Sequence, residues 1–246
     1  DVALRAAGAL ERHLDVHAHE TAAIIVEPLV QCAGGMAMYD AAYLARVRTL
    51  CDRYDVHLVA DEIAVGFGRT GSFFAHEQSG VRPDFLCLSK GITGGFLPLS
   101  VVMTTDGIYA AFYDDDTARG FLHSHSYTGN PLACSAALAV LDIFATDDVI
   151  ARNRERARVF DALAQPLRDD PRIAHFRRTG MIWAFDVPAA APGFARRYAQ
   201  AALSAGVLLR PLGNTVYFMP PYCLDEGQWS LLVSAAGHAL DTALDA

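Results

Sequence analysis

The sequence predicts an α/β fold, in which helices cover a mainly parallel sheet. Along the first 148 residues, apolar runs of strand length alternate with amphipathic stretches of helix length, as in parallel strands joined by crossover helices. Of the 246 residues, 52% are hydrophobic and only 20% are charged, which is enough apolar material for a sizeable core. After residue 148 the pattern changes to short strands between helices, which indicates a smaller α+β unit.

The first part of the chain predicts strands and helices in alternation. The apolar run at residues 22–26 is stopped by Glu27 and Pro28, as expected for a buried strand that ends in a loop. Asp40 is a suitable N-cap, because apolar residues recur from there to Tyr54 at helical spacing. In chain order we therefore expect a helix over residues 1–19, a strand at 22–26, a helix over 40–54, and strands at 56–60, 84–88 and 99–103.

A capping signal marks the next helix. Asn130 precedes Pro131 at the first helical position, and the apolar residues 132–145 predict a well-buried helix. We expect residues 1–148 to form part of a large domain and residues 149–246 to form a small C-terminal α+β domain. Within the small domain we expect a charged helix over about 149–169, strands within 173–187, a helix ending at Gly206, strands near 207–219 and a last helix from Asp225.

Composition excludes several classes of protein. The 20 Lys and Arg residues against 28 Asp and Glu residues give a formal charge of −8, which argues against binding nucleic acid through a generally basic surface. The longest apolar runs, such as residues 134–145, are shorter than the roughly 20 residues that a membrane-spanning helix needs. No secretory signal is recognisable at the start. Five scattered cysteines without a C-x-x-C pair predict reduced thiols in a cytoplasmic protein: Cys32, Cys51, Cys87, Cys134 and Cys223.

Other site patterns are matched only in part. Residues 66–71 fit the G-x-G-x-x-G dinucleotide pattern, but they do not follow a strand directly and no helix start comes after them. Residues 58–62 resemble the acidic strand end of a P-loop ATPase, yet no G-x-x-x-x-G-K-[ST] loop occurs. The histidine pairs at 17 and 19 and at 123 and 125 lack further ligands nearby, so we expect no metal site.

Lys90 and Asp61 are the strongest candidates for chemistry. Each closes a predicted buried strand, at the end of the sheet where α/β folds place their active sites. By position alone Lys90 could equally be a solvated loop lysine, but a carboxylate at the same sheet edge favours a catalytic role. The pair suits pyridoxal phosphate, because the amine binds the aldehyde covalently and the carboxylate keeps the pyridine nitrogen protonated.

Four motifs occur in order along the chain: IVEP at residues 25–28, DEI with GFGRTG at 61–63 and 66–71, SKGITGG at 89–95, and TGNPLA at 128–133. Together they resemble the class III, fold type I pyridoxal-phosphate aminotransferases. The resemblance covers the whole chain and implies the C-terminal part of that family's large parallel or mixed-sheet domain, followed by its small α+β domain.

The resemblance implies roles for four residues around the cofactor. Lys90 would bind the cofactor and shuttle protons, and Asp61 would pair with the pyridine nitrogen. Ile63 would pack on one face of the ring. Ser126 stands where the family usually has a threonine that binds the cofactor phosphate of the neighbouring subunit, so a homodimer is also implied.

A second set of motifs resembles the branch of the family that acts in biotin synthesis. The resemblance implies transfer of an amino group from S-adenosylmethionine to 8-amino-7-oxononanoate, with Arg210 clamping a substrate carboxylate and Tyr217 and Gly91 lining the pocket. Relatives that act on ω-amino acids carry a glutamate where Cys32 aligns and an arginine where Tyr217 aligns, and this sequence has neither charge. The motifs are GGM at 34–36, MY at 38–39, residues 123–131, LRPLG at 209–213 and YFMPPY at 217–222.

The resemblance extends over only the C-terminal part of a typical family member. The part not matched would supply the small-residue phosphate loop, the aromatic side chain on the other face of the ring, and further aromatic groups of the substrate pocket. We therefore expect a piece of a larger protein. Two alternatives stay open: another class III transaminase or aminomutase acting on an amino acid or diamine, or a dimerisation fragment without catalytic activity.

Overall fold

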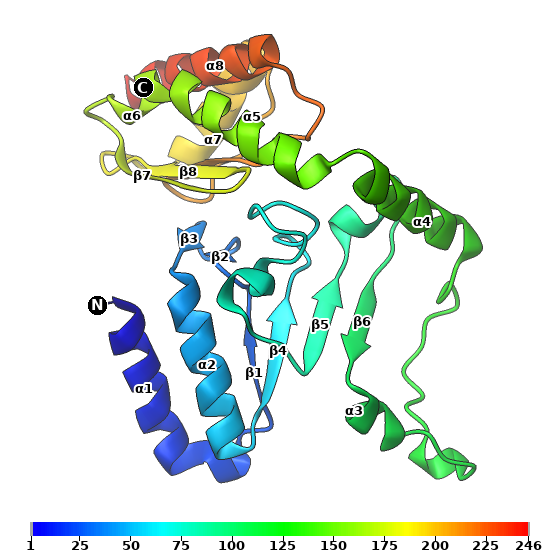
Figure 1. Cartoon of the computed structure of the whole chain (residues 1–246). Coiled ribbons are helices and arrows are strands. Elements are labelled where there is room, and N and C mark those ends of the chain that lie inside the picture. The colour runs from blue at the N-terminus through cyan, green and yellow to red at the C-terminus, as the bar shows by residue number, and fades with distance from the viewer. Residues whose placement is uncertain (1, 246) are drawn as a thin grey trace. The chain divides into compact units, whose positions relative to one another are not determined.

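The computed structural model describes residues 2–245, which form two compact units (Figure 1). The first unit contains Asp1–Leu29, Tyr39–Phe67 and Ser72–Asp148, and the second contains Val30–Met38, Gly68–Gly71 and Val149–Ala246. The sequence pattern placed one boundary near residue 148, but two short segments from before it pack with the second unit. Long-range packing rather than chain order assigns these segments to the second unit.

A four-stranded mixed sheet forms the centre of the first unit. Its order is β1-β4-β5-β6, and the first three strands are parallel. The last strand runs antiparallel to β5, whereas the alternation of strands and helices predicted a parallel strand there. Parallel neighbours are usually joined by a crossover helix, and residues 89–100 between these two strands contain only a single helical turn. The strands are β1 (Ala23–Val26), β4 (His57–Asp61), β5 (Phe85–Leu88) and β6 (Val101–Thr104).

Two helices cover one face of this sheet, side by side in Figure 1: α1 (Val2–His17) and α2 (Ala41–Tyr54). The predicted cap at the start of α2 forms, because the Asp40 side chain accepts a hydrogen bond from the Ala42 N–H. The apolar stripe of α2 is buried against Leu58 of β4, with Leu44, Val47 and Cys51 all at 0% exposure. The 3.6-residue spacing therefore predicted both the helix and the face that it buries.

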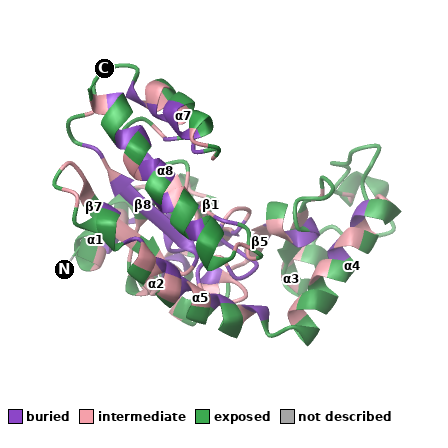
Figure 2. Cartoon of the chain, turned by 90° about the horizontal axis from the view of Figure 1, so that it is seen from above, coloured by how far each residue is buried: buried purple, intermediate pink, exposed green. Residues whose placement is uncertain are grey.

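The last helix of the first unit, α4, is less buried than the sequence predicted. It begins after Asn130, whose side chain caps it as expected. Only Ala133 and Ala137 are buried, while Leu132 is 70% exposed and Leu138 is 63% exposed. Figure 2 shows this helix as mostly exposed. A helix that is apolar on all sides needs partners on all sides, and the described chain covers only one side of α4 (Pro131–Thr146).

The smaller elements of the first unit are η1 (Ala18–Glu20), η2 (Ala75–Ser79), η3 (Lys90–Thr93), α3 (Asp106–Ala110) and η4 (Thr117–Arg119).

The second unit packs helices around a three-stranded antiparallel sheet of order β7-β8-β9. Its core is aromatic: Phe160 stacks on Trp229 at 4.7 Å between ring centroids, and Trp183 lies 4.8 Å from Trp229. Between residues 207 and 219 only β9 forms, where several strands were predicted. The elements are α5 (Val149–Leu163), α6 (Gln165–Arg168), β7 (Ala174–Thr179), β8 (Ile182–Asp186), α7 (Phe194–Ser204), β9 (Thr215–Phe218) and α8 (Glu226–Leu244).

Arginine side chains fix the two short segments to the second unit. Arg177 donates hydrogen bonds to the carbonyl oxygens of Gly35 (2.8 Å) and Met36 (2.9 Å), beside the hairpin of β2 (Val30–Gln31) and β3 (Ala37–Met38). Arg69, in the other segment, donates to the carbonyl of Pro220. Within residues 2–245, no helix is both long and apolar enough to cross a lipid bilayer.

Candidate active site

The sheet of the first unit brings Asp61 and Lys90 to the same edge. Asp61 is the last residue of β4, and Lys90 follows β5 after Ser89. Because β4 and β5 are parallel neighbours, with Asp61 directly opposite Cys87, their carboxyl ends lie at one edge. This is where open α/β sheets place their ligands.

Asp61 lies on the less buried face of the sheet. Side chains alternate between the two faces of a strand, and in β4 the alternate residues Leu58 and Ala60 are fully buried whereas Asp61 is half-buried. One Asp61 carboxylate oxygen accepts a hydrogen bond from the Ile63 N–H at 3.0 Å. Burial, and then the negative charge of Asp61, raise the pKa of the neighbouring Cys87 thiol. The carboxylate therefore acts on groups at this end of the sheet.

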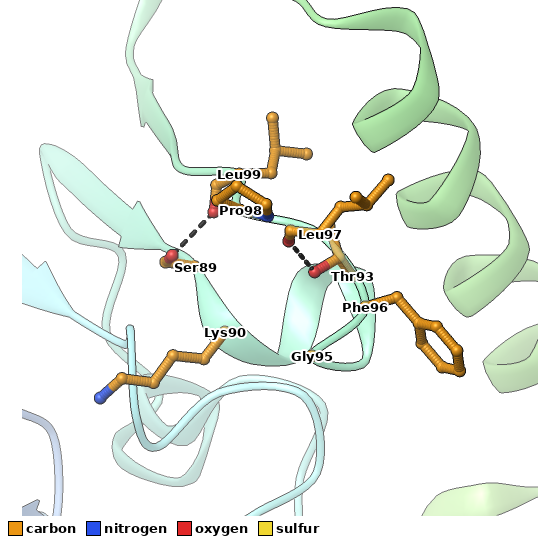
Figure 3. A pocket seen from close by; sticks show the side chains of 8 residues that line it. All are labelled: Ser89, Lys90, Thr93, Gly95, Phe96, Leu97, Pro98 and Leu99. Atoms are coloured by element: carbon orange, nitrogen blue, oxygen red, sulfur yellow. Dashed lines mark hydrogen bonds between the residues drawn. The ribbon is translucent and has the colours of Figure 1, made fainter.

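Lys90 begins the single turn η3 in a left-handed backbone conformation, with φ of +46°. Its side chain is exposed and points away from Phe96 in Figure 3. The loop that follows is held by two hydrogen bonds, from the Ser89 hydroxyl to the Leu99 carbonyl (2.7 Å) and from the Thr93 hydroxyl to the Leu97 carbonyl (2.6 Å). Residues 89–99 line a cavity of about 270 Å³ beside Lys90. The lysine thus stands at the rim of a fixed loop with an accessible amine.

Gly91 and Ile63 lie at the same edge. Ile63 is half-buried, directly after the β4 strand. A Cβ atom on Gly91 would lie 2.9 Å from both Cβ and Cδ2 of Phe67, closer than real Cβ atoms approach, so the position requires a glycine. Sequence reasoning assigned Gly91 to the substrate pocket and missed its packing against Phe67.

Ser126 lies apart from these residues. It belongs to the exposed stretch 121–130 between η4 and α4, which Figure 1 shows on the far side of β6 from β4. The structure does not bring its hydroxyl to Lys90 within one chain. The role that the resemblance implies for this serine, in the site of a neighbouring subunit, stays a prediction.

Arg210 and Tyr217 belong to the second unit. Tyr217 is half-buried in β9 opposite Ala184, and Arg210 is exposed in the irregular stretch before that strand. Cys32 lies in the same unit, between β2 and β3. The structure therefore does not bring these side chains together with Lys90 inside one unit.

Sequence reasoning also missed a buried carboxylate beside Asp61. Glu62 is 0% exposed, and its carboxylate accepts hydrogen bonds from the N–H groups of Ala75 (2.6 Å) and His76 (2.8 Å). The ring Nδ1 of His76 lies 2.7 Å from the same carboxylate. The two-residue period of a strand could have indicated this burial. Consecutive side chains point to opposite faces of a sheet, so Glu62 lies on the face opposite to Asp61.

The weaker motifs adopt ordinary local structure. Residues 66–71 form turns with no helix directly after them. His17 is hydrogen bonded to Glu20, and His123 and His125 are exposed. Among residues 2–245, no group of three or more His, Cys, Asp or Glu side chains is arranged to hold a metal ion.

The sequence has relatives of known activity. The family model described as Aminotransferase class-III matches residues 1–240. The adenosylmethionine-8-amino-7-oxononanoate aminotransferase of Helicobacter pylori is 46% identical over 239 residues, which is 95% of this chain and 55% of that relative. The protein of the same name from Nitratidesulfovibrio vulgaris is 42% identical over 245 residues, which is 95% of this chain and 45% of that relative. The chain spans about half the length of these relatives.

Solved structures share the fold. An amine transaminase from an uncultivated Pseudomonas species, in its PLP-bound form, superposes with a TM-score of 0.86 at 35% identity, covering 97% of this chain and 56% of that one. The adenosylmethionine-8-amino-7-oxononanoate aminotransferase of Methanocaldococcus jannaschii gives 0.88 at 32% identity, covering 96% and 57%. These likenesses confirm the predicted α/β, fold type I architecture. The chain therefore belongs to the class III aminotransferase family.

Proposed function

We propose that the protein carrying this chain is a pyridoxal-phosphate-dependent transaminase of biotin synthesis. It transfers the amino group of S-adenosylmethionine to 8-amino-7-oxononanoate and yields 7,8-diaminononanoate. The relatives with this name at 42–46% identity support the choice of substrates. The observation that carries the proposal is the placement of Asp61 and Lys90 at the ends of two neighbouring parallel strands.

The residues at this edge fit pyridoxal phosphate chemically. An exposed primary amine is available for its aldehyde on Lys90, and a half-buried carboxylate is available for its pyridine nitrogen on Asp61. The sheet face that carries Asp61 is incompletely covered in this chain, since Ile25 is 65% exposed and Val102 is 63% exposed. The chemical fit to pyridoxal phosphate therefore depends on the Lys90 amine and the Asp61 carboxylate.

Lys90 and Asp61 divide the chemistry between them. When bound, pyridoxal phosphate supplies a ring that stabilises negative charge on the substrate carbon beside the nitrogen. The Lys90 Nζ would hold the cofactor aldehyde and, as a free amine, would accept and return a proton at the substrate carbon. The negative charge of Asp61 favours a protonated pyridine nitrogen and so increases the electron demand of the ring.

Other residues orient the two reactants. Ile63 would pack against the ring, Arg210 would bind a substrate carboxylate, and Tyr217 and Gly91 would each contact the substrate. These assignments follow the motifs and stay proposals. Neither position 32 nor position 217 carries the charge that ω-amino acid transaminases use, which supports S-adenosylmethionine over ornithine-like donors.

We propose that the protein acts as a homodimer. Ser126 then binds the phosphate of the cofactor in the partner subunit. Exposed apolar side chains are frequent in residues 96–141, a pattern that marks interaction surfaces. Figure 2 shows α4, which carries some of them, as mostly exposed. These side chains include Phe96, Phe112, Tyr113, Phe121, Leu122, Tyr127, Leu132, Leu138 and Leu141. The five free thiols support a reducing compartment, for which we propose the cytoplasm.

The lysine assignment is tested in the full-length protein that carries this chain. Lys90→Ala should abolish the visible absorbance that appears when pyridoxal phosphate is added, together with its trapping by borohydride. Asp61→Ala should lower turnover by several orders of magnitude and leave the fold unchanged by circular dichroism. An absorbing, reducible adduct that survives Lys90→Ala, or a near wild-type rate for Asp61→Ala, would contradict the proposal.

The donor and the role of the chain need separate assays. Turnover of 8-amino-7-oxononanoate with S-adenosylmethionine is compared with turnover with alanine and lysine. A preference for either amino acid would indicate another class III transaminase. Failure of the full-length protein to bind pyridoxal phosphate at all would instead favour a dimerisation or binding role.

A further inference from the structure

We propose that Phe67 and Glu62 are positioning residues that set the distance between Asp61 and Lys90. They belong to one segment, residues 61–67, here called the brace loop. It begins at Asp61 on the end of β4, and it ends at Phe67, which packs against Gly91 beside Lys90. This inference rests on the proposed roles of Asp61 and Lys90.

The contact at the end of the brace loop is unusually close. An added Cβ on Gly91 would meet Cβ and Cδ2 of Phe67 at 2.9 Å, so the phenylalanine lies directly on the glycine backbone. Phe67 itself is 4% exposed and has a left-handed backbone, with φ of +54°. Lys90, the neighbour of Gly91, is also left-handed at +46°.

Two side-chain-bearing residues in the left-handed region are costly and persist only where their surroundings hold them. Such strain gathers at functional sites. Lys90 is the first residue of η3. Backbone hydrogen bonds close this single turn, and one of them runs from the Ile92 N–H to the Ser89 carbonyl at 3.2 Å. We therefore infer that the Phe67 ring, by packing on Gly91, holds the Lys90 backbone in its left-handed conformation.

Glu62 fixes the beginning of the brace loop. Its fully buried carboxylate accepts the N–H groups of Ala75 and His76, at the start of η2. Its own carbonyl accepts the Gly66 N–H at 3.0 Å, and its own N–H donates to the Cys87 carbonyl at 3.0 Å. Buried charge of this kind is tolerated only when it is hydrogen bonded, and here the bonds join β4, β5 and η2.

The side chains of Asp61 and Glu62 therefore have different roles. Consecutive residues at the end of a strand point to opposite faces, so Asp61 stays on the open face while Glu62 enters the packed interior. Displacement of Glu62 would move Asp61 at one end of the loop and Phe67 at the other. One loop thus ties the two charged groups to a single rigid frame.

Phe73 provides a matched control. It belongs to the same aromatic cluster as Phe67, with ring centroids 5.5 Å apart, and it also touches Phe74 and Phe144. The three atoms nearest to the Cβ position of Gly91 all belong to Phe67 and none to Phe73. A purely structural role in the cluster would make Phe67→Leu and Phe73→Leu behave alike.

The experiment compares Phe67→Leu, Glu62→Gln and Phe73→Leu in the full-length protein. Without cofactor, hydrogen exchange of the Ile92 and Gly94 amides should be about tenfold faster in the first two variants, since local opening becomes easier. With pyridoxal phosphate, the pH midpoint of the absorbing Lys90 adduct should shift by about half a unit or more, and the cofactor's Kd should rise about tenfold. Phe73→Leu should change none of these.

Equal exchange rates and equal pH midpoints in Phe67→Leu and Phe73→Leu would overturn the inference. If Phe67→Leu does not fold, Glu62→Gln carries the test, because it preserves side-chain volume, and an unchanged pH midpoint there would overturn the inference as well. Loss of the proposed function has a different signature. In that case Lys90→Ala keeps the adduct, while the cofactor-free exchange rates still report on the brace loop.

Discussion

The turn between β7 and β8 offers a sharp test of packing in the second unit. Gly180 has φ of +55°, and a Cβ there would lie 2.4 Å from the Arg69 carbonyl oxygen and 2.7 Å from Thr70 Cα. Gly213 has nearly the same backbone, with φ of +62°, but nothing lies within 4 Å of its Cβ position. An alanine at either site would be strained by the left-handed backbone. Only in Gly180→Ala would the added Cβ also clash with neighbouring backbone atoms.

The difference in free energy follows from this geometry. The left-handed conformation costs an alanine about 1–2 kcal/mol at either site. Overpacking adds about 1–3 kcal/mol. We expect the upper part of that range for Gly180→Ala, because the obstructing atoms are backbone and the Arg69 carbonyl also accepts the Met181 N–H at 2.8 Å. Gly180→Ala should thus destabilise by about 3 kcal/mol more than Gly213→Ala.

Thermal denaturation of the full-length protein measures the difference. The shift is about 2–4 °C for each kcal/mol in a cooperative unit of 150–250 residues and smaller in a larger one, so the Tm of Gly180→Ala should lie several degrees below that of Gly213→Ala. Circular dichroism at low temperature checks that both variants fold. Equal Tm values would refute the reasoning, since they would mean that residues 68–71 do not press on the β7–β8 turn.

Two further predictions concern titration and reactivity. Burial alone would raise the pKa of Asp84, but hydrogen bonds from Arg48 and a backbone N–H lower it below its usual value. A carboxylate with a depressed pKa gives its full stabilisation above its unfolded-state pKa of about 3.9, and this stability is lost as the pH falls below that value towards the folded-state pKa. The Tm should fall over that range, and less steeply in Asp84→Asn; an equally steep fall would contradict the assignment. Burial raises the pKa of Cys51 to about 11, so an aromatic disulfide reagent at pH 8 should modify the exposed Cys223 first and Cys51 only on unfolding. Comparable rates for both thiols in the native protein would contradict this.

Local signals predicted most of the elements. The Asp40 cap, the stripe that follows it and the Asn130 cap each involve residues within a few positions of one another, and the structure contains both helices. The expectations that failed needed distant partners. The burial of α4 depends on which surfaces pack against it, and the direction of β6 depends on the absence of a crossover helix between residues 88 and 101.

The candidate site divides in the same way. The sequence alone indicated Lys90 and Asp61, because each follows a buried strand, and its motifs led to the family that the comparisons establish. The sequence did not indicate that Phe67 packs on Gly91, because this contact joins a residue in the loop after β4 to a residue in the loop after β5. The roles of Ile63, Ser126, Arg210 and Tyr217 stay predictions.

By itself, the sequence determined where strands and helices begin and which charged residues end the strands, since both follow from periodicity and capping over a few residues. Only the tertiary structure decided that Asp61 lies opposite Cys87, that Glu62 is buried against the backbone N–H groups of Ala75 and His76, and that residues 30–38 and 68–71 pack with the second unit. The physical reason is that pairing register and close packing join segments that are far apart in the chain. No local pattern of hydrophobicity specifies such contacts.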